Sequence, residues 1–279
     1  MRCVLCNGDQ VRQIFEKRGI PYHRCIACGF VFSRPCGNPN IASTLDDYEP
    51  AYLRYLDESV EDERNHLALL RWVEQFRAVN GRSVLDIGCG SGKFVRFLLN
   101  AKAEACGIEP SEPLFSRFLI DDPFFVCQTL GEYANGSKPE RFELIFACDV
   151  IEHVERPDHF LRDAAMLLRS GGILFVSTPD VGSIPARFFG KGWHYFNRYH
   201  LSYLSRKTIG VMAGRFGLRE VGYARLPRWK SVGYVLQYTG DFVIGRSRMR
   251  IPDRLNGLII PMNLFDTMTI AFEKEGERV

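Results

Sequence analysis

Apolar positions between residues 83 and 179 fall into short continuous runs that alternate with stretches of helical spacing. The runs at 83–87, 105–108, 124–127, 142–148 and 173–179 are the length of buried strands. Apolar residues at helical spacing follow the first run, and helices are also predicted from residue 112 and over 157–169, closed by Ser170, Gly171 and Gly172. This order predicts an α/β fold with a Rossmann-like, doubly wound sheet.

The pattern also predicts elements on both sides of this region. Residues 11–15 and 22–24 read as short strands joined around Gly19, and 41–80 as mainly helical, with an apolar stripe at Leu69, Val73 and Phe76. Towards the C-terminus, 208–216 read as a helix, and 218–226 and 266–273 as strands. We therefore expect a small domain at 1–40, a helical connection at 41–80 and the main domain at 81–279, with insertions at 181–207 and 227–263.

The turn after the first run, residues 88–92, carries three alternating glycines. Glycine permits positive φ and close approach of a ligand to the backbone. Asp86 precedes the turn, and Glu109 stands 23 positions later at the end of the next predicted strand. A carboxylate at the turn would repel a pyrophosphate but suits a ligand that carries an ammonium group, and Glu109 is placed to accept the hydroxyl protons of a ribose. The Gly-x-Gly-x-Gly spacing also differs from the dinucleotide fingerprint.

This Asp-x-Gly-x-Gly-x-Gly turn followed by an acid resembles class I S-adenosylmethionine (SAM) methyltransferases, as does the strand that runs into Glu152-His153-Val154. The resemblance implies a seven-stranded sheet, SAM as cofactor, and helices before the first strand that bring Tyr48, Tyr52 or Tyr55 over the cleft. It implies a set of cofactor-binding residues at the strand ends: Asp86, Gly88, Cys89, Gly90, Gly92, Glu109, Pro110, Thr129, Leu130, Cys148 and Asp149.

Two Cys-x-x-Cys pairs stand in the first 28 residues, at Cys3 and Cys6 and at Cys25 and Cys28. Two such turns can complete a tetrahedral Zn²⁺ site, and four cysteines leave no open coordination position, so the zinc is expected to be structural. Glycines at Gly8 and Gly29 suit the turns after each pair. A ribbon before this domain resembles a bacterial group that includes sugar C-methyltransferases, although those enzymes carry a further C-terminal domain that this chain is too short to hold.

The segment 188–202 is aromatic and basic, holds two histidines and has no acid. In the family that the chain resembles, the region after the fifth strand lines the acceptor pocket. Methyl transfer to a hydroxyl needs a base, and a neutral imidazole is suited to this near pH 7. The candidate catalytic residues are His200, His153 and His194, with His200 placed first, although a structural hydrogen bond is an alternative for each.

Charge is spread unevenly along the chain, whose net charge is +3. Residues 46–63 hold eight acids and one arginine, whereas 181–240 hold ten lysines or arginines and one acid. The basic stretch is consistent with an anionic acceptor or with a solvated face. Residues 227–263 mix aromatics with arginines and could cap the site, form a dimer contact or lie on a membrane surface.

No apolar run approaches the ~18 residues of a spanning helix and no signal segment is evident, so a cytoplasmic protein with thiol or metal-bound cysteines is expected. The leading prediction is a SAM-dependent methyltransferase that O-methylates a small anionic metabolite, such as a sugar nucleotide or glycan precursor, with C- or N-methylation left open. The alternatives are an RNA methyltransferase, in which the ribbon and the basic segment bind phosphates, and a non-catalytic zinc-ribbon adaptor. Nucleic acid is the less favoured partner.

Overall fold

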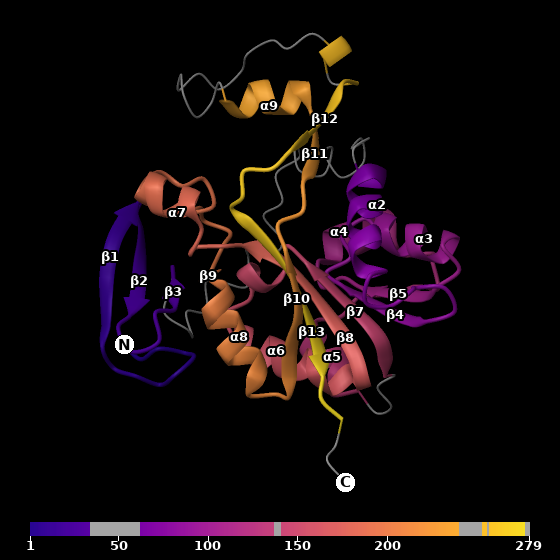
Figure 1. Ribbon diagram of the computed structural model, residues 1–279, viewed down its shortest axis with the longest axis horizontal. Coiled ribbons are helices and arrows are strands. Elements are labelled where there is room, and N and C mark those ends of the chain that lie inside the picture. The colour runs from indigo at the N-terminus through magenta and orange to yellow at the C-terminus, as the bar shows by residue number, and fades with distance from the viewer. Residues whose placement is uncertain (34–61, 137–140, 240–252, 256, 277–279) are drawn as a thin grey trace.

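The computed structural model describes residues 1–33, 62–136, 141–239, 253–255 and 257–276. Its centre is a seven-stranded sheet with the strand order β10-β13-β8-β7-β4-β5-β6 (Figure 1). Strand β13 runs antiparallel to both of its neighbours, and the other pairings are parallel. The strands are β4 (Ser83–Ile87), β5 (Glu104–Ile108), β6 (Phe125–Val126), β7 (Phe142–Cys148), β8 (Leu168–Pro179), β10 (Leu218–Ala224) and β13 (Thr267–Lys274). The predicted doubly wound α/β sheet is confirmed.

Helices cover both faces of this sheet. Successive side chains of β7 alternate between two apolar clusters: Ile145 packs with α5, α6 and α8, whereas Leu144 and Phe146 pack with α2, α3 and α4. A strand that is buried on both faces reads as a continuous apolar run, which explains the sequence of β7. The helices are α2 (Asp62–Val73), α3 (Lys93–Asn100), α4 (Glu112–Phe118), α5 (Leu130–Ala134), α6 (Pro157–Leu167) and α8 (Arg206–Gly214).

Two strand predictions were wrong in detail. The run 124–127 is not fully buried, because β6 lies at the edge of the sheet and leaves Phe124 45% and Val126 37% exposed. The residues expected to close the preceding helix, Ser170–Gly172, lie inside β8, which begins at Leu168. Gly171 has a φ of +72° there, and the pairing of β8 with β7 shifts register over this stretch, so the glycines form an irregularity within the strand.

The N-terminal segment forms a four-stranded antiparallel sheet, although only two strands were predicted. Its order is β1 (Val11–Lys17), β2 (Ile20–Cys25), β3 (Val31–Phe32) and β9 (Ser202–Tyr203), so its last strand comes from far along the chain. This sheet lies beside the main domain in Figure 1. Cys3, Leu5, Phe30 and Phe32 share an apolar cluster with α6 and α8, and the Arg215 guanidinium donates to the Leu5 carbonyl oxygen. The two parts therefore pack as one body.

A third group of elements lies above the carboxyl ends of the parallel strands in Figure 1. It contains the hairpin of β11 (Arg228–Ser231) and β12 (Ile259–Met262) and helix α9 (Val232–Thr239). The side chain of Asn65 on α2 holds it, accepting from the Trp229 amide at 2.7 Å and donating to the Trp229 carbonyl at 3.2 Å. The hairpin is thus attached to α2, and the three roles considered for 227–263 stay predictions.

Three predictions fall partly or wholly outside the described residues. The 35–39 linker, the 41–61 part of the predicted helical connection with its three tyrosines, and the arginines at 246, 248 and 250 lie there. Within the described part, α2 and the turn after it carry the predicted apolar stripe at Leu69, Val73 and Phe76. Every helix that can be described is too short or too polar to cross a membrane.

Candidate functional site

The glycine turn between β4 and α3 adopts the backbone that its sequence predicts. Gly88, Gly90 and Gly92 have φ values of +67°, +56° and +75°. A Cβ on Gly88 would stand 2.7 Å from Val150, and one on Gly92 would stand 2.6 Å from the Phe125 ring. At Gly88 and Gly92 a side chain is therefore excluded both by the backbone conformation and by neighbouring residues, whereas at Gly90 the backbone conformation alone disfavours it. The turn brings backbone amides to the carboxyl edge of the sheet, where ligands bind in open α/β folds.

Glu109 is tied to this turn. It is 4% exposed, and its two carboxylate oxygens accept from the amides of Gly90 at 2.8 Å and Ser111 at 2.9 Å. Each oxygen has a second lone pair, so the carboxylate can still accept from a ligand hydroxyl. The next residue, Pro110, leads into α4, whose N-cap is Ser111.

Asp86 is buried at the end of β4 and is 5% exposed. Burial, and next the charge of Glu109, raise its pKa to about 8. Two carboxyl groups thus share a buried site, and within the described part of the chain no cation contributes to the pKa of either. A positively charged ligand would stabilise the ionised form of both.

On the other side of the turn, β7 ends at Cys148 and Asp149, where the chain bends sharply. Asp149 has a φ of +57° and forms a bidentate ion pair with Arg228 of β11, at 2.5 and 2.7 Å. Although burial opposes it, the Arg228 guanidinium lowers the pKa of Asp149. The pair connects β11 to the end of β7, a contact that no motif in the sequence indicated.

Two of the three candidate histidines meet just beyond this bend. The rings of His153 and His200 have centroids 4.8 Å apart and are nearly perpendicular. His153 Nδ1 donates to the Tyr199 carbonyl oxygen at 3.0 Å, and burial lowers the pKa of His200 to about 3. Both imidazoles are therefore neutral at pH 7. Glu152 lies beside them, 2% exposed, and accepts from the Thr178 hydroxyl at 2.9 Å.

The third candidate, His194, occupies a different place. Its Nε2 lies 3.7 Å from the Asp266 carboxylate, which also accepts from the Trp193 indole at 3.1 Å. Asp266 precedes β13, so this group fastens the 181–207 insertion to the sheet. Tyr195 lies between His194 and His200, with ring centroids 4.0 and 5.7 Å from them.

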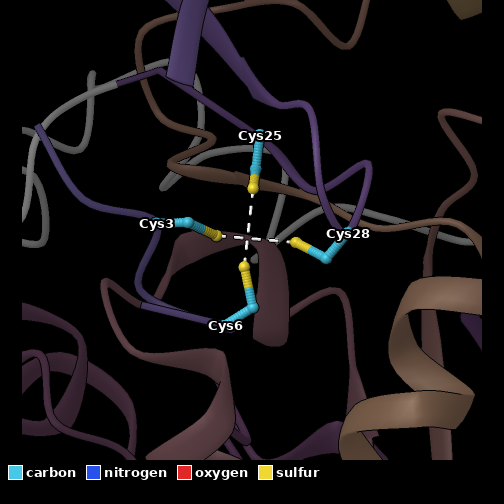
Figure 2. A group of neighbouring side chains, drawn as sticks. All are labelled: Cys3, Cys6, Cys25 and Cys28. Carbon is cyan, nitrogen blue, oxygen red and sulfur yellow. Dashed lines mark hydrogen bonds between the residues drawn. The ribbon is translucent and has the colours of Figure 1, made fainter. Parts of the chain in front are cut away.

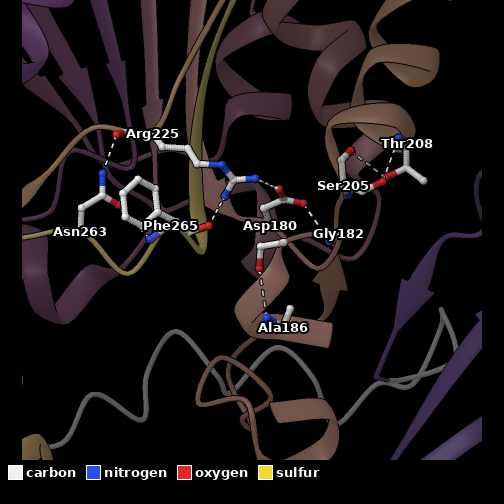
Figure 3. Close-up of polar contacts among 9 residues, drawn as sticks. Asp180, Gly182, Ala186, Ser205, Thr208, Arg225, Asn263 and Phe265 are labelled. Atoms are coloured by element: carbon white, nitrogen blue, oxygen red, sulfur yellow. Dashed lines mark hydrogen bonds and ion pairs between the residues drawn. The ribbon is translucent and has the colours of Figure 1, made fainter. Parts of the chain in front are cut away.

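The start of the same segment is fixed by a second polar group, shown in Figure 3. Asp180, which is 4% exposed, pairs with Arg225 at 2.6 Å and accepts from the Gly182 amide at 2.8 Å. Arg225 also donates to the Phe265 carbonyl oxygen. The chain after β8 is thereby attached to the ends of β10 and β13.

The four cysteines of the N-terminal segment converge, as Figure 2 shows. The Sγ atoms of Cys3 and Cys28, and those of Cys6 and Cys25, are 3.5 Å apart, and all four lie within 4.8 Å of one another. This donor set fits a tetrahedral Zn²⁺ site. Gly29 has the predicted positive φ of +77°, but in the first turn the positive φ belongs to Asn7 and not to Gly8.

A family model described as a methyltransferase domain matches residues 52–221, which is more than half of the chain. The chain belongs to this methyltransferase family. Its seven-stranded mixed sheet is typical of a class I SAM-dependent methyltransferase domain, and the expectation from sequence is confirmed at this level.

Curated relatives of this methyltransferase domain share part of its length. A ubiquinone biosynthesis O-methyltransferase from Bradyrhizobium diazoefficiens is 32% identical over 149 residues, which are 46% of this chain and 56% of the relative. One of the same name from Stutzerimonas stutzeri is 28% identical over 114 residues, 39% of this chain and 49% of the relative. The chain spans about half the length of the curated relatives it matches.

Solved structures agree with the methyltransferase fold. A SAM-dependent methyltransferase from Archaeoglobus fulgidus aligns with a TM-score of 0.55 at 17% identity, covering 81% of this chain and 100% of that one. The 1,6-didemethyltoxoflavin-N1-methyltransferase of Burkholderia thailandensis aligns with a TM-score of 0.52 at 15% identity, covering 90% and 98%. At these identities the likeness concerns the fold alone.

The remaining candidates of the methyltransferase site lie along the same edge of the sheet. Thr129 caps α5 and shares hydrogen bonds with Glu132, and Leu130 begins that helix. Cys89 is buried within the glycine turn, where its Sγ lies close to Gly107. Sequence reasoning did not single out Glu152, Thr178 or Arg228. Glu152 was within reach, because it stands in the Glu-His-Val motif, whereas Arg228 has no local signature.

Proposed function

We propose that this chain transfers the methyl group of SAM to a hydroxyl of a small anionic acceptor, such as a sugar nucleotide or glycan precursor. The observation that carries the proposal is the pair of neutral imidazoles just beyond the end of β7, of which His153 is half-buried and His200 is buried. O-methylation is further supported by the curated relatives, which are named O-methyltransferases. An anionic acceptor is consistent with the basic stretch at 181–240.

In this proposal the glycine turn and Asp86 hold the amino acid end of SAM, and Glu109 binds its ribose hydroxyls. Thr129 and Leu130 lie on the adenine side, and Cys148 and Asp149 lie near the sulfonium. The buried carboxyl groups at the turn support this assignment, because a bound cation would stabilise their ionised forms, which burial disfavours.

The reaction is an in-line displacement. The acceptor oxygen forms a bond to the methyl carbon while the bond from that carbon to sulfur breaks, and S-adenosylhomocysteine leaves. The hydroxyl proton leaves on the side of Glu152, His153 and His200 and passes from there to solvent. The enzyme contributes alignment and exclusion of water, which together supply much of the rate enhancement in such transfers.

We also propose that Cys3, Cys6, Cys25 and Cys28 hold a structural Zn²⁺. The N-terminal segment, residues 1–33, is too short to bury a sufficient core by itself, so ligation would contribute to its folding free energy. The ion would have no open position for chemistry.

The acceptor can be identified by transfer of label. The protein is incubated with methyl-labelled SAM and a metabolite extract, and separately with total RNA, and the labelled product is isolated. We expect the label in a small anionic metabolite, as a base-stable methyl ether. Label on carbon or nitrogen would contradict O-methylation, and label confined to RNA would contradict the small acceptor.

SAM binding is expected to release protons near pH 7. In the free protein the pKa of Asp86 is raised to about 8, so this carboxyl is mostly protonated at pH 7. A bound cation lowers that pKa, so binding should release up to about one proton, and affinity should rise between pH 6 and pH 8. Calorimetry in two buffers with different ionisation enthalpies measures the release. Binding heats that do not depend on the buffer would contradict a raised pKa at Asp86.

Replacing His200 by alanine is expected to slow transfer to the labelled acceptor by about 100-fold or more, the scale of acid–base assistance. SAM affinity should stay within about 3-fold, because His200 belongs to the acceptor side. The matched control is His159→Ala, which removes an exposed imidazole from α6. An unchanged transfer rate in His200→Ala would remove this residue from the proposed site.

A further inference from the structure

We propose that Glu152, His153 and His200 bind a divalent transition-metal cation, at a second metal site separate from the four cysteines. One donor atom from each of these side chains lies within 4.8 Å of the other two. Two imidazoles and one carboxylate on one side of a cation form a common ligand set, which leaves further coordination positions open. The inference deepens the proposed function, on which its catalytic meaning rests.

Two of the three side chains, His153 and Glu152, already have a second hydrogen-bond partner, as metal ligands commonly do. His153 Nδ1 donates to the Tyr199 carbonyl oxygen, which leaves the lone pair of the neutral ring on Nε2. The Thr178 hydroxyl donates to one oxygen of Glu152 and leaves the other available. Such outer contacts fix the tautomer and the direction of a ligand before the metal arrives.

His200 gives an independent indication. Its Nδ1 is fully buried and has no hydrogen-bond partner in the described part of the chain. Buried polar atoms without a partner are uncommon in folded proteins, because each costs about 1–3 kcal/mol of desolvation. A cation coordinated by this nitrogen would account for its orientation.

The cluster is not explained by hydrogen bonds among its own members. Among the described hydrogen bonds of Glu152, His153 and His200, none joins the carboxyl group to either imidazole, although all three donor atoms converge. A buried carboxylate normally has a cation or several donors to compensate its charge. Here Thr178 is the one side-chain donor described for it.

Nitrogen and carboxylate ligands suit Mn²⁺, Fe²⁺ or Zn²⁺, whereas Ca²⁺ and Mg²⁺ favour sites made of oxygen alone. With the proposed function, an acceptor hydroxyl would fill an open position and ionise more readily. Its proton would then pass to solvent, and His153 and His200 would serve as ligands in place of bases. The acceptor should accordingly offer an oxygen that can coordinate a metal.

Mn²⁺ is the suitable probe, because it binds imidazole and carboxylate and competes poorly for thiolates. The full-length protein with zinc in its cysteine cluster is titrated with Mn²⁺, and free Mn²⁺ is followed by its paramagnetic resonance signal. We expect one Mn²⁺ per chain. Glu152→Gln, which nearly preserves the side chain's shape, and His200→Ala should each weaken binding at least 10-fold, whereas His159→Ala should not.

SAM binding is measured by calorimetry for each variant, because a variant that binds SAM has a folded methyltransferase domain. Wild-type protein that binds SAM but takes up no Mn²⁺, or Glu152→Gln and His200→Ala proteins that bind Mn²⁺ as the wild type does, would overturn the second metal site and leave the methyltransferase proposal standing. Failure of the wild type to bind SAM would instead refute the proposed function. If His200→Ala does not fold, Glu152→Gln alone decides the question.

Discussion

Replacing Glu109 by alanine is expected to lower the affinity for SAM by about 100-fold or more. The carboxylate accepts two backbone hydrogen bonds, from Gly90 and Ser111, which shape the glycine turn before any ligand binds. Hydrogen bonds to a charged group contribute about 1.5–3 kcal/mol each, and the proposed ribose contacts would be lost as well. Isothermal titration calorimetry with SAM, and with S-adenosylhomocysteine, measures the change.

Glu104→Ala is the matched control, because it removes an exposed carboxylate from the start of the same strand, β5. Its SAM affinity should stay within about 2-fold of the wild type. Glu109→Gln should fall between the two, since its amide keeps one acceptor oxygen but points a donor at the other backbone amide. A Glu109→Ala protein that binds SAM within 10-fold of the wild type would refute this assignment.

The second large effect is expected from Cys25→Ser, which removes one thiolate from the proposed zinc site. Structural zinc contributes apparent free energies of about 10–16 kcal/mol in small zinc domains, so loss of a ligand should unfold the N-terminal sheet. Transfer to the acceptor should then fall by about 100-fold or more, whereas SAM affinity should change by less than about 5-fold. The reason is that this sheet supports the acceptor side and makes no described hydrogen bond to the glycine turn.

Two contacts connect the N-terminal sheet to the segment that contains His200. Strand β3 pairs with β9, and the Ser33 hydroxyl donates to the His200 carbonyl oxygen at 2.9 Å. Hydrogen exchange of 11–25 and 193–203 should therefore accelerate together in Cys25→Ser. Cys127→Ser, which alters a thiol on the edge of the main sheet, should leave both segments protected. Rapid exchange confined to 11–25 would show that residues 193–203 keep their structure without the ribbon, contrary to this prediction.

The parts of the fold that the sequence predicted are those dictated by local physics. The run of β7 is apolar because both faces are covered, and the glycine turn needs positive φ at each glycine. The two Cys-x-x-Cys pairs could be recognised in the sequence for the same reason, because the spacing of the ligands is set within each turn. Their convergence within 4.8 Å agrees with that expectation.

The features that were missed depend on residues far apart in the chain. β9 is two residues long and has no strand pattern, and it exists because β3 offers it a free edge. The ion pair of Arg228 with Asp149 joins positions 79 apart, and nothing near Arg228 marks it. For the same reason His200 could be named as a candidate, but its meeting with Glu152 and His153 could not be foreseen.

Strand β9 belongs both to the ribbon's sheet and to the 181–207 segment, which affects how this enzyme can evolve and be engineered. Since the last strand of the ribbon's sheet is also the end of the segment that carries His194 and His200, neither piece is a free module. A variant in which only the ribbon is exchanged for that of another protein should have an altered substrate choice. A variant in which residues 1–33 and 181–207 are exchanged together should acquire the substrate choice of the donor protein.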